Sequence, residues 1–169
     1  MVKIIGICCL ASICVAVGIR KAAKLKKRVE YLEKLILLLR FIISQIQYTA
    51  EPFSVIFKKA ASMQEFAELS FLLSTDAKEE FQSPFLLMKK RIAEFESTGI
   101  LHKDDLSLLD NLADAMGALN AEGEIRQLQL YGKLLEERLQ NARKEYAEKG
   151  KMFRTLGALG GAAVFIILI

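Results

Sequence analysis

The chain ends in Lys151-Met-Phe-Arg-Thr-Leu-Gly-Ala-Leu-Gly-Gly-Ala-Ala-Val-Phe-Ile-Ile-Leu-Ile169, a basic step followed by an apolar run. The 14 residues from Leu156 onward carry no charge and no strongly polar side chain. As a helix they rise about 21 Å, against roughly 30 Å for the hydrocarbon layer of a bilayer. The stem of Arg154 can extend along the apolar layer while its guanidinium reaches the headgroups. We therefore expect a C-terminal transmembrane segment over residues 156–169.

Small residues recur in this tail at a spacing that places them on one helix face. Gly157 and Gly161 form a Gly-x-x-x-Gly pair, reinforced by Ala158 and Ala162. A face without side-chain bulk lets a second membrane helix approach closely. We predict that Gly157 and Gly161 form a membrane helix-packing face, with the first apolar segment of the chain as its nearest candidate partner. A buried core helix or a frayed tail is the alternative.

The chain also begins with an apolar run, over residues 4–19. Ala16 and Gly18 fit the small positions of a signal-peptidase site, which would lead to cleavage and export. The six cations directly after the run resist translocation, so we favour an uncleaved N-terminal transmembrane anchor over residues 1–19. Three cysteines lie inside this run and match no Cys-x-x-Cys spacing, so we interpret them as small apolar side chains (Cys8, Cys9 and Cys14).

Basic residues flank both apolar ends on the side that faces the middle of the chain. The positive-inside rule then places residues 20–155 in the cytoplasm and both termini at the far surface of the cell membrane, which makes the chain a multi-pass protein. Each cation near the surface should attract anionic lipid by about 1 kcal/mol. The predicted anionic-lipid flank comprises Arg20, Lys21, Lys24, Lys26, Lys27, Arg28, Lys151 and Arg154.

The composition favours one domain and argues against nucleic acid as a partner. A chain of 169 residues holds a single core, and 53% hydrophobic content is high for a soluble protein of this size. The net charge of +4 is modest, and 20 acidic residues are interspersed among 24 basic ones. A continuous basic surface for nucleic acid is therefore not indicated.

Between the predicted anchors the pattern is helical throughout. The first long helix has an apolar stripe with alternating spacings of four and three, at Leu25, Val29, Leu32, Ile36, Leu39, Ile43 and Ile46. Leu35, Leu38 and Ile42 widen this stripe to a second face. Such a helix is either central in a bundle or covered by another subunit, and we name these three residues as candidate subunit contacts.

Punctuating residues divide the remainder into further helices. Pro52 and Ser83-Pro84 are typical of helix starts, Gly99 of a helix end, and Asp104-Asp105 of a first turn. A last long helix is expected from about Glu122 to Lys149. No run alternates with a period of two. The predicted fold class is therefore all-α, an antiparallel helical bundle of five to seven helices over residues 20–155, flanked by two membrane-anchoring helices.

The sequence lacks the residue patterns that enzymes use. Its one histidine, His102, has no second histidine or cysteine nearby to share a metal, and we expect it in a solvated loop. No phosphate-binding glycine loop, His-Glu-x-x-His or Gly-x-Ser-x-Gly motif occurs. We expect no enzymatic activity, no catalytic or metal-binding residue and no cofactor.

Three segments carry a resemblance to a known family. They are Leu112-Ala-Asp-Ala-Met-Gly-Ala-Leu-Asn-Ala-Glu-Gly-Glu124, the tail Met152-Phe-Arg-Thr-Leu-Gly-Ala-Leu-Gly-Gly161, and the stretch from Ile46-x-Tyr48 to Pro52-Phe53. Together with the order of elements, they resemble the stage III sporulation protein AB family over the full length. That family usually has Phe-Gly, Asp and Gln where this chain has Leu112-Ala113, Asn120 and Glu124.

The resemblance implies a mother-cell membrane protein of an endospore-forming bacterium. It would be a scaffold in the channel complex that joins mother cell and forespore, with a soluble part similar to cytoplasmic domains of type II secretion and type IV pilus platform proteins. The expected partners are the membrane, other channel subunits, the cytoplasmic ATPase of the complex and further copies of the chain. The alternative from another class is an exported helical bundle that binds an envelope ligand after signal cleavage.

Overall fold

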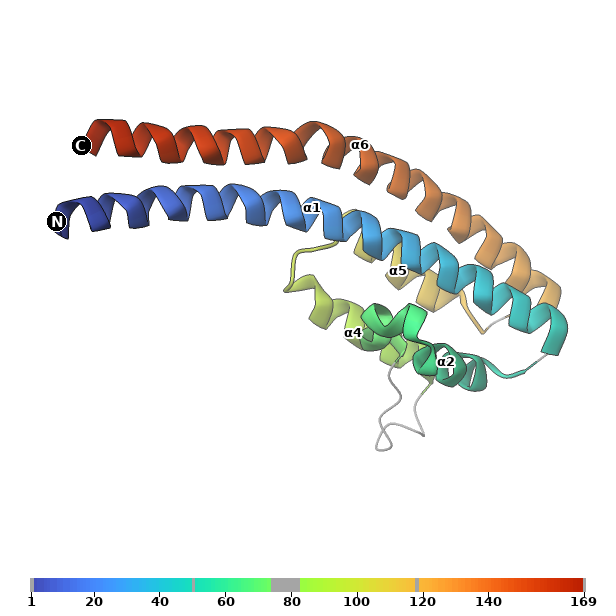
Figure 1. Ribbon diagram of the computed structural model, residues 1–169. Coiled ribbons are helices and arrows are strands. Elements are labelled where there is room, and N and C mark those ends of the chain that lie inside the picture. The colour runs from blue at the N-terminus through green and yellow to red at the C-terminus, as the bar shows by residue number, and fades with distance from the viewer. Residues whose placement is uncertain (1, 50, 74–82, 118, 169) are drawn as a thin grey trace. The chain divides into compact units, whose positions relative to one another are not determined.

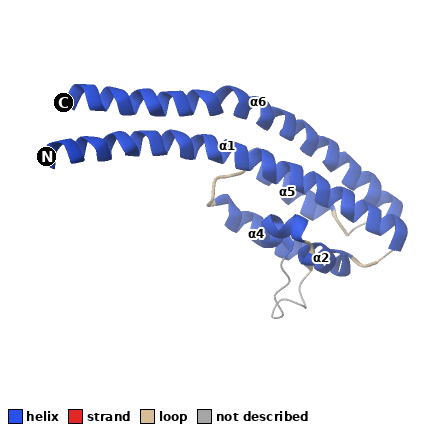
Figure 2. Ribbon diagram, viewed as in Figure 1, coloured by secondary structure: helices blue, strands red, loops and turns tan. Residues whose placement is uncertain are grey.

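The computed structural model describes the backbone of residues 2–49, 51–73, 83–117 and 119–168, and their side chains except at 2–11, 70, 164, 165, 167 and 168. Every regular element in this part of the chain is helical (Figure 1, Figure 2). The predicted all-α class is confirmed. The elements are α1 (Val2–Thr49), α2 (Phe53–Ser62), the 3-10 helix η1 (Gln64–Leu69), α3 (Ser70–Leu73), α4 (Pro84–Glu96), α5 (Lys103–Ala115) and α6 (Ala121–Leu168).

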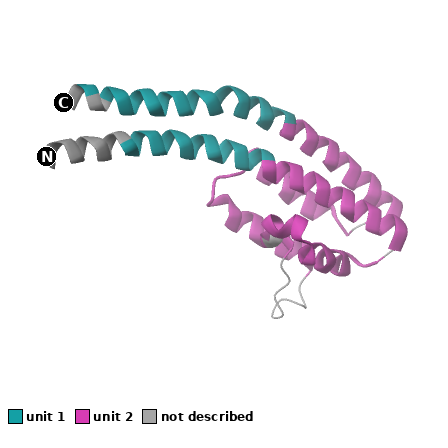
Figure 3. Cartoon of the chain, in the orientation of Figure 1, with its two compact units in different colours: residues 1–29, 140–169 teal, residues 30–139 magenta. Residues whose placement is uncertain are grey.

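The helices form two compact units, which Figure 3 distinguishes by colour. Unit 1 consists of residues 1–29 and 140–169, and unit 2 of residues 30–139. Helices α1 and α6 each contribute residues to both units. The domain boundaries expected at 19/20 and at 155/156 therefore fall inside continuous helices.

The length of α1 follows from its sequence. No glycine or proline occurs between Ile19 and Glu51, so nothing interrupts the backbone hydrogen-bond ladder. The helix ends at Thr49, shortly before Pro52, because proline cannot donate a backbone hydrogen bond and restricts the residue before it. The predicted apolar stripe faces inward, with Leu32 and Leu39 buried. The expected first bundle helix is thus part of a longer one.

Unit 2 has a core to which nearly all its helices contribute. Phe71 stacks on Phe95 with 4.1 Å between ring centroids, and Tyr31 of α1 lies against both rings. Helix α1 is the central element, because its second apolar face is covered by other helices of the same chain. The largest fully buried apolar side chains of the unit are Phe66, Leu32, Leu35, Ile56, Leu69, Leu109, Leu128 and Leu135.

The short helices agree with most of the sequence punctuation. Helix α4 begins at Pro84 with Ser83 as its N-cap residue, and Gly99 has a positive φ of 55° just after its end. Helix α5 begins one residue before Asp104, and both aspartates lie in its first turn. Residues 64–73 form two short elements, the 3-10 helix η1 followed by the one-turn α3.

The two membrane-spanning anchors expected at residues 1–19 and 156–169 are not supported. Among the described residues, no helix contains a stretch long and apolar enough to cross a membrane. Most of the first apolar run, and the last residues of the second, lie outside the residues whose side chains are described. Both runs are parts of the long helices α1 and α6.

Candidate functional site

Helices α1 and α6 pair in opposite directions within unit 1. Gly18 of α1 lies against Gly157 of α6, and the Lys21 ammonium is 5.4 Å from the centre of the Phe153 ring. Further along α1, Arg28 donates a hydrogen bond to Glu145, which lies earlier in α6. As the residue number rises along α1 it falls along α6, which defines an antiparallel pair (Figure 3).

The two backbones touch where this pair is closest. A Cβ atom added to Gly18 would lie 2.5 Å from the carbonyl oxygen of Phe153 and 3.0 Å from Cα of Gly157. A Cβ atom added to Gly157 would lie 3.1 Å from Cα of Gly18 and 3.2 Å from the carbonyl oxygen of Cys14. A side chain at Gly18 has no room, since only backbone lies opposite it, and the contact at Gly157 is tight but less so.

We call the contact between Gly18 and Gly157 the glycine seam. Further small residues near it are buried, Ala22 on α1 and Gly161 on α6. Of the two predicted packing residues, Gly157 therefore packs directly against the backbone of α1, and Gly161 is buried. Sequence reasoning missed Gly18, the partner of Gly157, although Gly18 and Ala22 have the same small-x-x-x-small spacing.

Large apolar side chains of unit 1 lie on the outside of the helix pair. They are 47% to 74% exposed, and none of them enters the glycine seam. A helix pair in water normally buries its large apolar residues at the contact and exposes polar ones. Unit 1 has the opposite arrangement over its apolar ends. The exposed residues are Ile13, Val17, Ile19, Met152, Leu156, Leu159 and Ile166.

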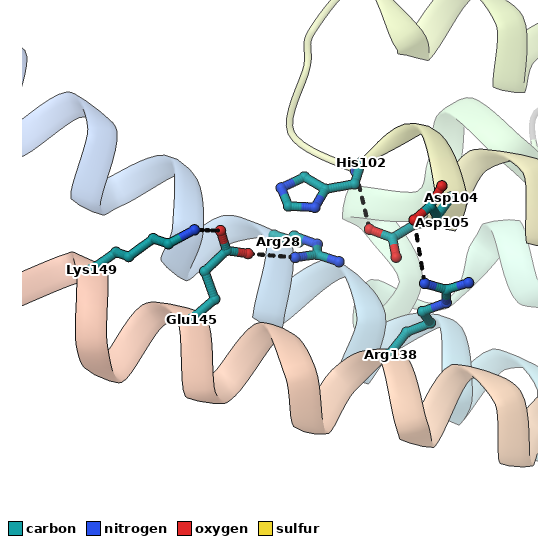
Figure 4. Close-up of polar contacts among 7 residues, drawn as sticks. All are labelled: Arg28, His102, Asp104, Asp105, Arg138, Glu145 and Lys149. Atoms are coloured by element: carbon teal, nitrogen blue, oxygen red, sulfur yellow. Dashed lines mark hydrogen bonds and ion pairs between the residues drawn. The ribbon is translucent and has the colours of Figure 1, made fainter.

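One ion-pair cluster joins the two helices at the inner end of unit 1 (Figure 4). The carboxylate of Glu145 accepts a hydrogen bond from Arg28 at 2.8 Å and a second from Lys149 at 2.8 Å. The side chain of Arg28 is only 6% exposed and that of Glu145 19%. Arg28 is therefore not part of the lipid-facing flank in which the sequence placed it, because its charge is buried against Glu145.

The other members of the predicted flank are exposed. Lys21 lies over the ring of Phe153, and Arg154 donates a hydrogen bond to the Tyr146 hydroxyl at 3.3 Å. These aromatic contacts position the charged groups without neutralising their charge. The exposed cations are Arg20, Lys21, Lys24, Lys26, Lys27, Lys151 and Arg154.

The two units differ in the sign of their charge. Unit 1 contains 12 of the 24 basic residues but only 2 of the 20 acidic ones, Glu145 and Glu148, which gives it a formal charge of +10. The remaining 12 basic and 18 acidic residues give unit 2 a charge of −6. The modest net charge of the whole chain thus conceals a strongly basic unit and an acidic one.

The three residues named as candidate subunit contacts lie inside unit 2. Leu35, Leu38 and Ile42 are 2% to 5% exposed and border a residual cavity of about 20 Å³. Side chains of α4 and α5, including Met88 and Leu109, line the same cavity. In this fold the three residues are core, because the short helices cover the face that sequence reasoning left open.

A surface groove of unit 2 lies between α1 and α6 instead. Its volume is about 240 Å³, and its apolar lining includes Ile36, Ile43 and Leu128. Gly132 lies in this groove, and a Cβ atom added there would meet nothing within 4 Å. The ion pair from Arg40 to Glu136, at 2.8 Å, lies at the same groove.

A carboxylate anchors the loop that leads into α6. Oε1 of Glu124 accepts hydrogen bonds from the backbone N–H groups of Gly117 at 2.8 Å and Leu119 at 3.0 Å. Oε2 is buried without a hydrogen-bond partner in the described structure. Asn120 caps the helix by accepting a hydrogen bond from the N–H of Gly123 at 2.9 Å.

The start of α5 carries the one histidine of the chain. His102 is the N-cap residue, and its backbone N–H donates to the buried carboxylate of Asp105 at 3.0 Å (Figure 4). Asp104 next to it pairs with Arg138 at 3.5 Å. The expected solvated loop position is thus refined to a helix start, and the described residues contain no group of three or more metal-ligand side chains.

A second groove, of about 310 Å³, lies between α4 and α5 and is lined by Lys89 and Asp110. The Lys89 ammonium hydrogen-bonds to Asp114 at 2.7 Å, and this bond, followed by the charge of Asp110, raises the pKa of Lys89. The Lys89 ammonium is thus paired with two carboxylates of α5.

Comparison of the amino-acid sequence with protein families gives a match. A family model described as stage III sporulation protein AB matches residues 3–169, which agrees with the resemblance inferred from the sequence. No curated protein and no solved structure matches the chain.

Proposed function

The chain belongs to the stage III sporulation protein AB family, and from this membership we propose that it is a non-enzymatic scaffold subunit of the channel complex between mother cell and forespore. Unit 1 attaches it to the mother-cell membrane, with both ends of the chain inserted. Unit 2 lies in the cytoplasm and contacts other subunits, including the ATPase of the complex. The resemblance to secretion platform proteins supports this role by analogy.

The reversed packing of unit 1 is the observation that carries the membrane part of this proposal. A helix pair with glycine at its contact and Ile13, Leu156 and Leu159 on its outside would expose a large apolar surface to water. In lipid the same arrangement is favourable, since acyl chains solvate the large side chains while small residues allow close backbone packing.

The distribution of charge supports the orientation. The cations of unit 1 follow directly on the apolar part of α1 and directly precede that of α6. Cations at the inner side of both segments keep that side in the cytoplasm. Unit 2 would then be cytoplasmic.

Alkaline carbonate extraction of membranes from sporulating cells tests the attachment. We expect the chain to remain in the membrane pellet. Replacing Leu156 and Leu159 by glutamate should release it, because two charges in the hydrocarbon layer cost about 5 kcal/mol together. The matched control replaces Leu130 and Leu134, which are exposed leucines of α6 in unit 2, and should stay in the pellet. Quantitative extraction of the unmodified chain would refute membrane attachment.

Site-specific crosslinking tests the scaffold role. The groove with Gly132 is our candidate contact, because it is apolar, open and lies on unit 2. In a chain whose native cysteines are alanine, Gly132→Cys should crosslink to another channel subunit or another copy during sporulation. Leu130→Cys, two residues away on another side of α6 and also exposed, is the control. Equal crosslinking at both positions, or none at Gly132, would argue against this contact.

A further inference from the structure

We propose that a cluster of cations in unit 1, next to its apolar ends and called the ring below, binds the phosphate groups of anionic phospholipids. The inference rests on the membrane attachment proposed above and adds the chemistry of the lipid that is bound. The ring consists of Arg20, Lys21, Lys24 and Lys27 of α1 with Lys151 and Arg154 of α6, all of which are exposed.

The register of the two helices brings these cations together. Gly18 lies against Gly157, and Lys21 lies over Phe153 at 5.4 Å. Continuing the antiparallel register by one turn places Lys24 level with Lys151. Two basic segments far apart in the sequence therefore meet at the same depth, next to the apolar outer faces of both helices.

The charge of the ring is not neutralised within unit 1. Its only acidic residues are Glu145 and Glu148, and Glu145 already binds Arg28 and Lys149. Arg20, Lys24 and Lys27 form no ion pair with any described residue. Arg154 donates to the neutral hydroxyl of Tyr146. The guanidinium and ammonium groups therefore keep their charge for an external anion.

A lipid phosphate fits this ring better than a soluble anion does. The cations border the exposed apolar side chains Ile19, Met152 and Leu156, so a ligand with a phosphate and acyl chains can contact both surfaces together. Charges near an anionic membrane surface strengthen binding by about five-fold each. A polyphosphate or a nucleic acid would use only the charged part of this surface.

Flotation with lipid vesicles tests the ring. The full chain is diluted from detergent onto vesicles of phosphatidylcholine alone, or of phosphatidylcholine with phosphatidylglycerol, and the floating fraction is measured. We expect stronger binding to the anionic vesicles, with a preference that weakens between roughly 0.1 M and 1 M salt as the Debye length falls from about 10 Å to about 3 Å.

Three variants, each with three substitutions, test whether the ring or the net charge of the chain determines the preference for anionic vesicles. Replacing Lys21, Lys24 and Lys27 together by glutamine should lower the preference for anionic vesicles roughly 100-fold. Replacing the same three by arginine should leave it unchanged. The control replaces three exposed lysines of unit 2 by glutamine, which should have little effect (Lys58, Lys103 and Lys133).

Each other outcome contradicts a different step. Equal binding to both kinds of vesicle, unchanged in the glutamine variant, overturns the ring and leaves membrane attachment intact. Absence of binding to either vesicle overturns the attachment and the ring together. A loss of preference of the same size in the unit 2 control overturns the assignment to these residues, because net charge alone would then explain the binding.

Discussion

A methyl group added to Gly18 should loosen the helix pair of unit 1 more than the same group added elsewhere in it. The new Cβ of Gly18→Ala would lie 2.5 Å from the carbonyl oxygen of Phe153 and 3.0 Å from Cα of Gly157. Both opposing atoms are backbone, so no side chain can rotate away and the helices must separate. Overpacking of this kind typically costs 1 to 3 kcal/mol, and a rigid backbone opposite calls for about 3. Alanine recovers about 1 kcal/mol through its higher helix propensity.

The net destabilisation of Gly18→Ala is therefore about 2 kcal/mol. For Gly157→Ala the atoms nearest to the new Cβ are 3.1 Å and 3.2 Å away, and a small shift of the helices relieves this contact. The cost of overpacking and the gain in helix propensity therefore nearly cancel. For Gly160→Ala nothing lies within 4 Å, and only the gain of about 1 kcal/mol remains. One substitution thus has three expected outcomes at three glycines.

Hydrogen exchange of the full chain in mild detergent or in bilayer discs measures these differences. Amides of residues 12–29 and 140–163 should exchange about 30-fold faster in Gly18→Ala, at nearly the original rate in Gly157→Ala, and more slowly in Gly160→Ala. Amides of unit 2 serve as the internal reference. If Gly18→Ala and Gly160→Ala have the same exchange rates, the helices do not meet at Gly18 and the reasoning from the seam is refuted.

Substitutions at three further sites test the remaining structure. Gly117→Ala should destabilise unit 2 by about 2 to 4 kcal/mol, because φ is +85° and the Cβ would clash with the ring of Phe85. Gly132→Ala should not destabilise it, and urea unfolding measures the free energy of unfolding of both variants. Glu124→Gln should be neutral or stabilising, since its oxygen still accepts both loop N–H groups, but Glu124→Leu should cost roughly 2 kcal/mol or more in the same assay. Arg28→Met should destabilise unit 1 by about 2 kcal/mol, because it leaves the carboxylate of Glu145 without Arg28. Adding Glu145→Leu removes that carboxylate and should restore the hydrogen-exchange protection of unit 1. No recovery in the double variant would exclude a buried pair.

The sequence predicted the helices well because their signals are local. The three-four spacing of Leu32 and Leu39, the helix start at Ser83-Pro84 and the absence of glycine in most of α1 each act within one or two turns. Such signals specify where a helix begins, ends and is apolar. They say nothing of which helix will lie opposite.

What the sequence left open depends on contacts between distant segments. Arg28 reads as one more solvated cation in a basic run, because its partner Glu145 is 117 residues away. The periodicity of Leu35 and Ile42 predicts an apolar face that another element must bury. It does not tell whether short helices of the same chain or another subunit bury this face. Gly18 resembles a cleavage position as much as a packing position until Gly157 is placed against it.

The features of unit 1 depend on one another through the register of its helices. A shift of α6 by one turn would bring either Phe153 or Gly161 opposite Gly18, and in both cases it would take Glu145 away from the buried Arg28. The glycine contact excludes the shift that brings in Phe153 by shape, and the buried ion pair disfavours both shifts by charge. That register also places Lys24 level with Lys151. A variant that loosens the glycine contact should for this reason weaken the preference for anionic lipid as well, although it removes no charge.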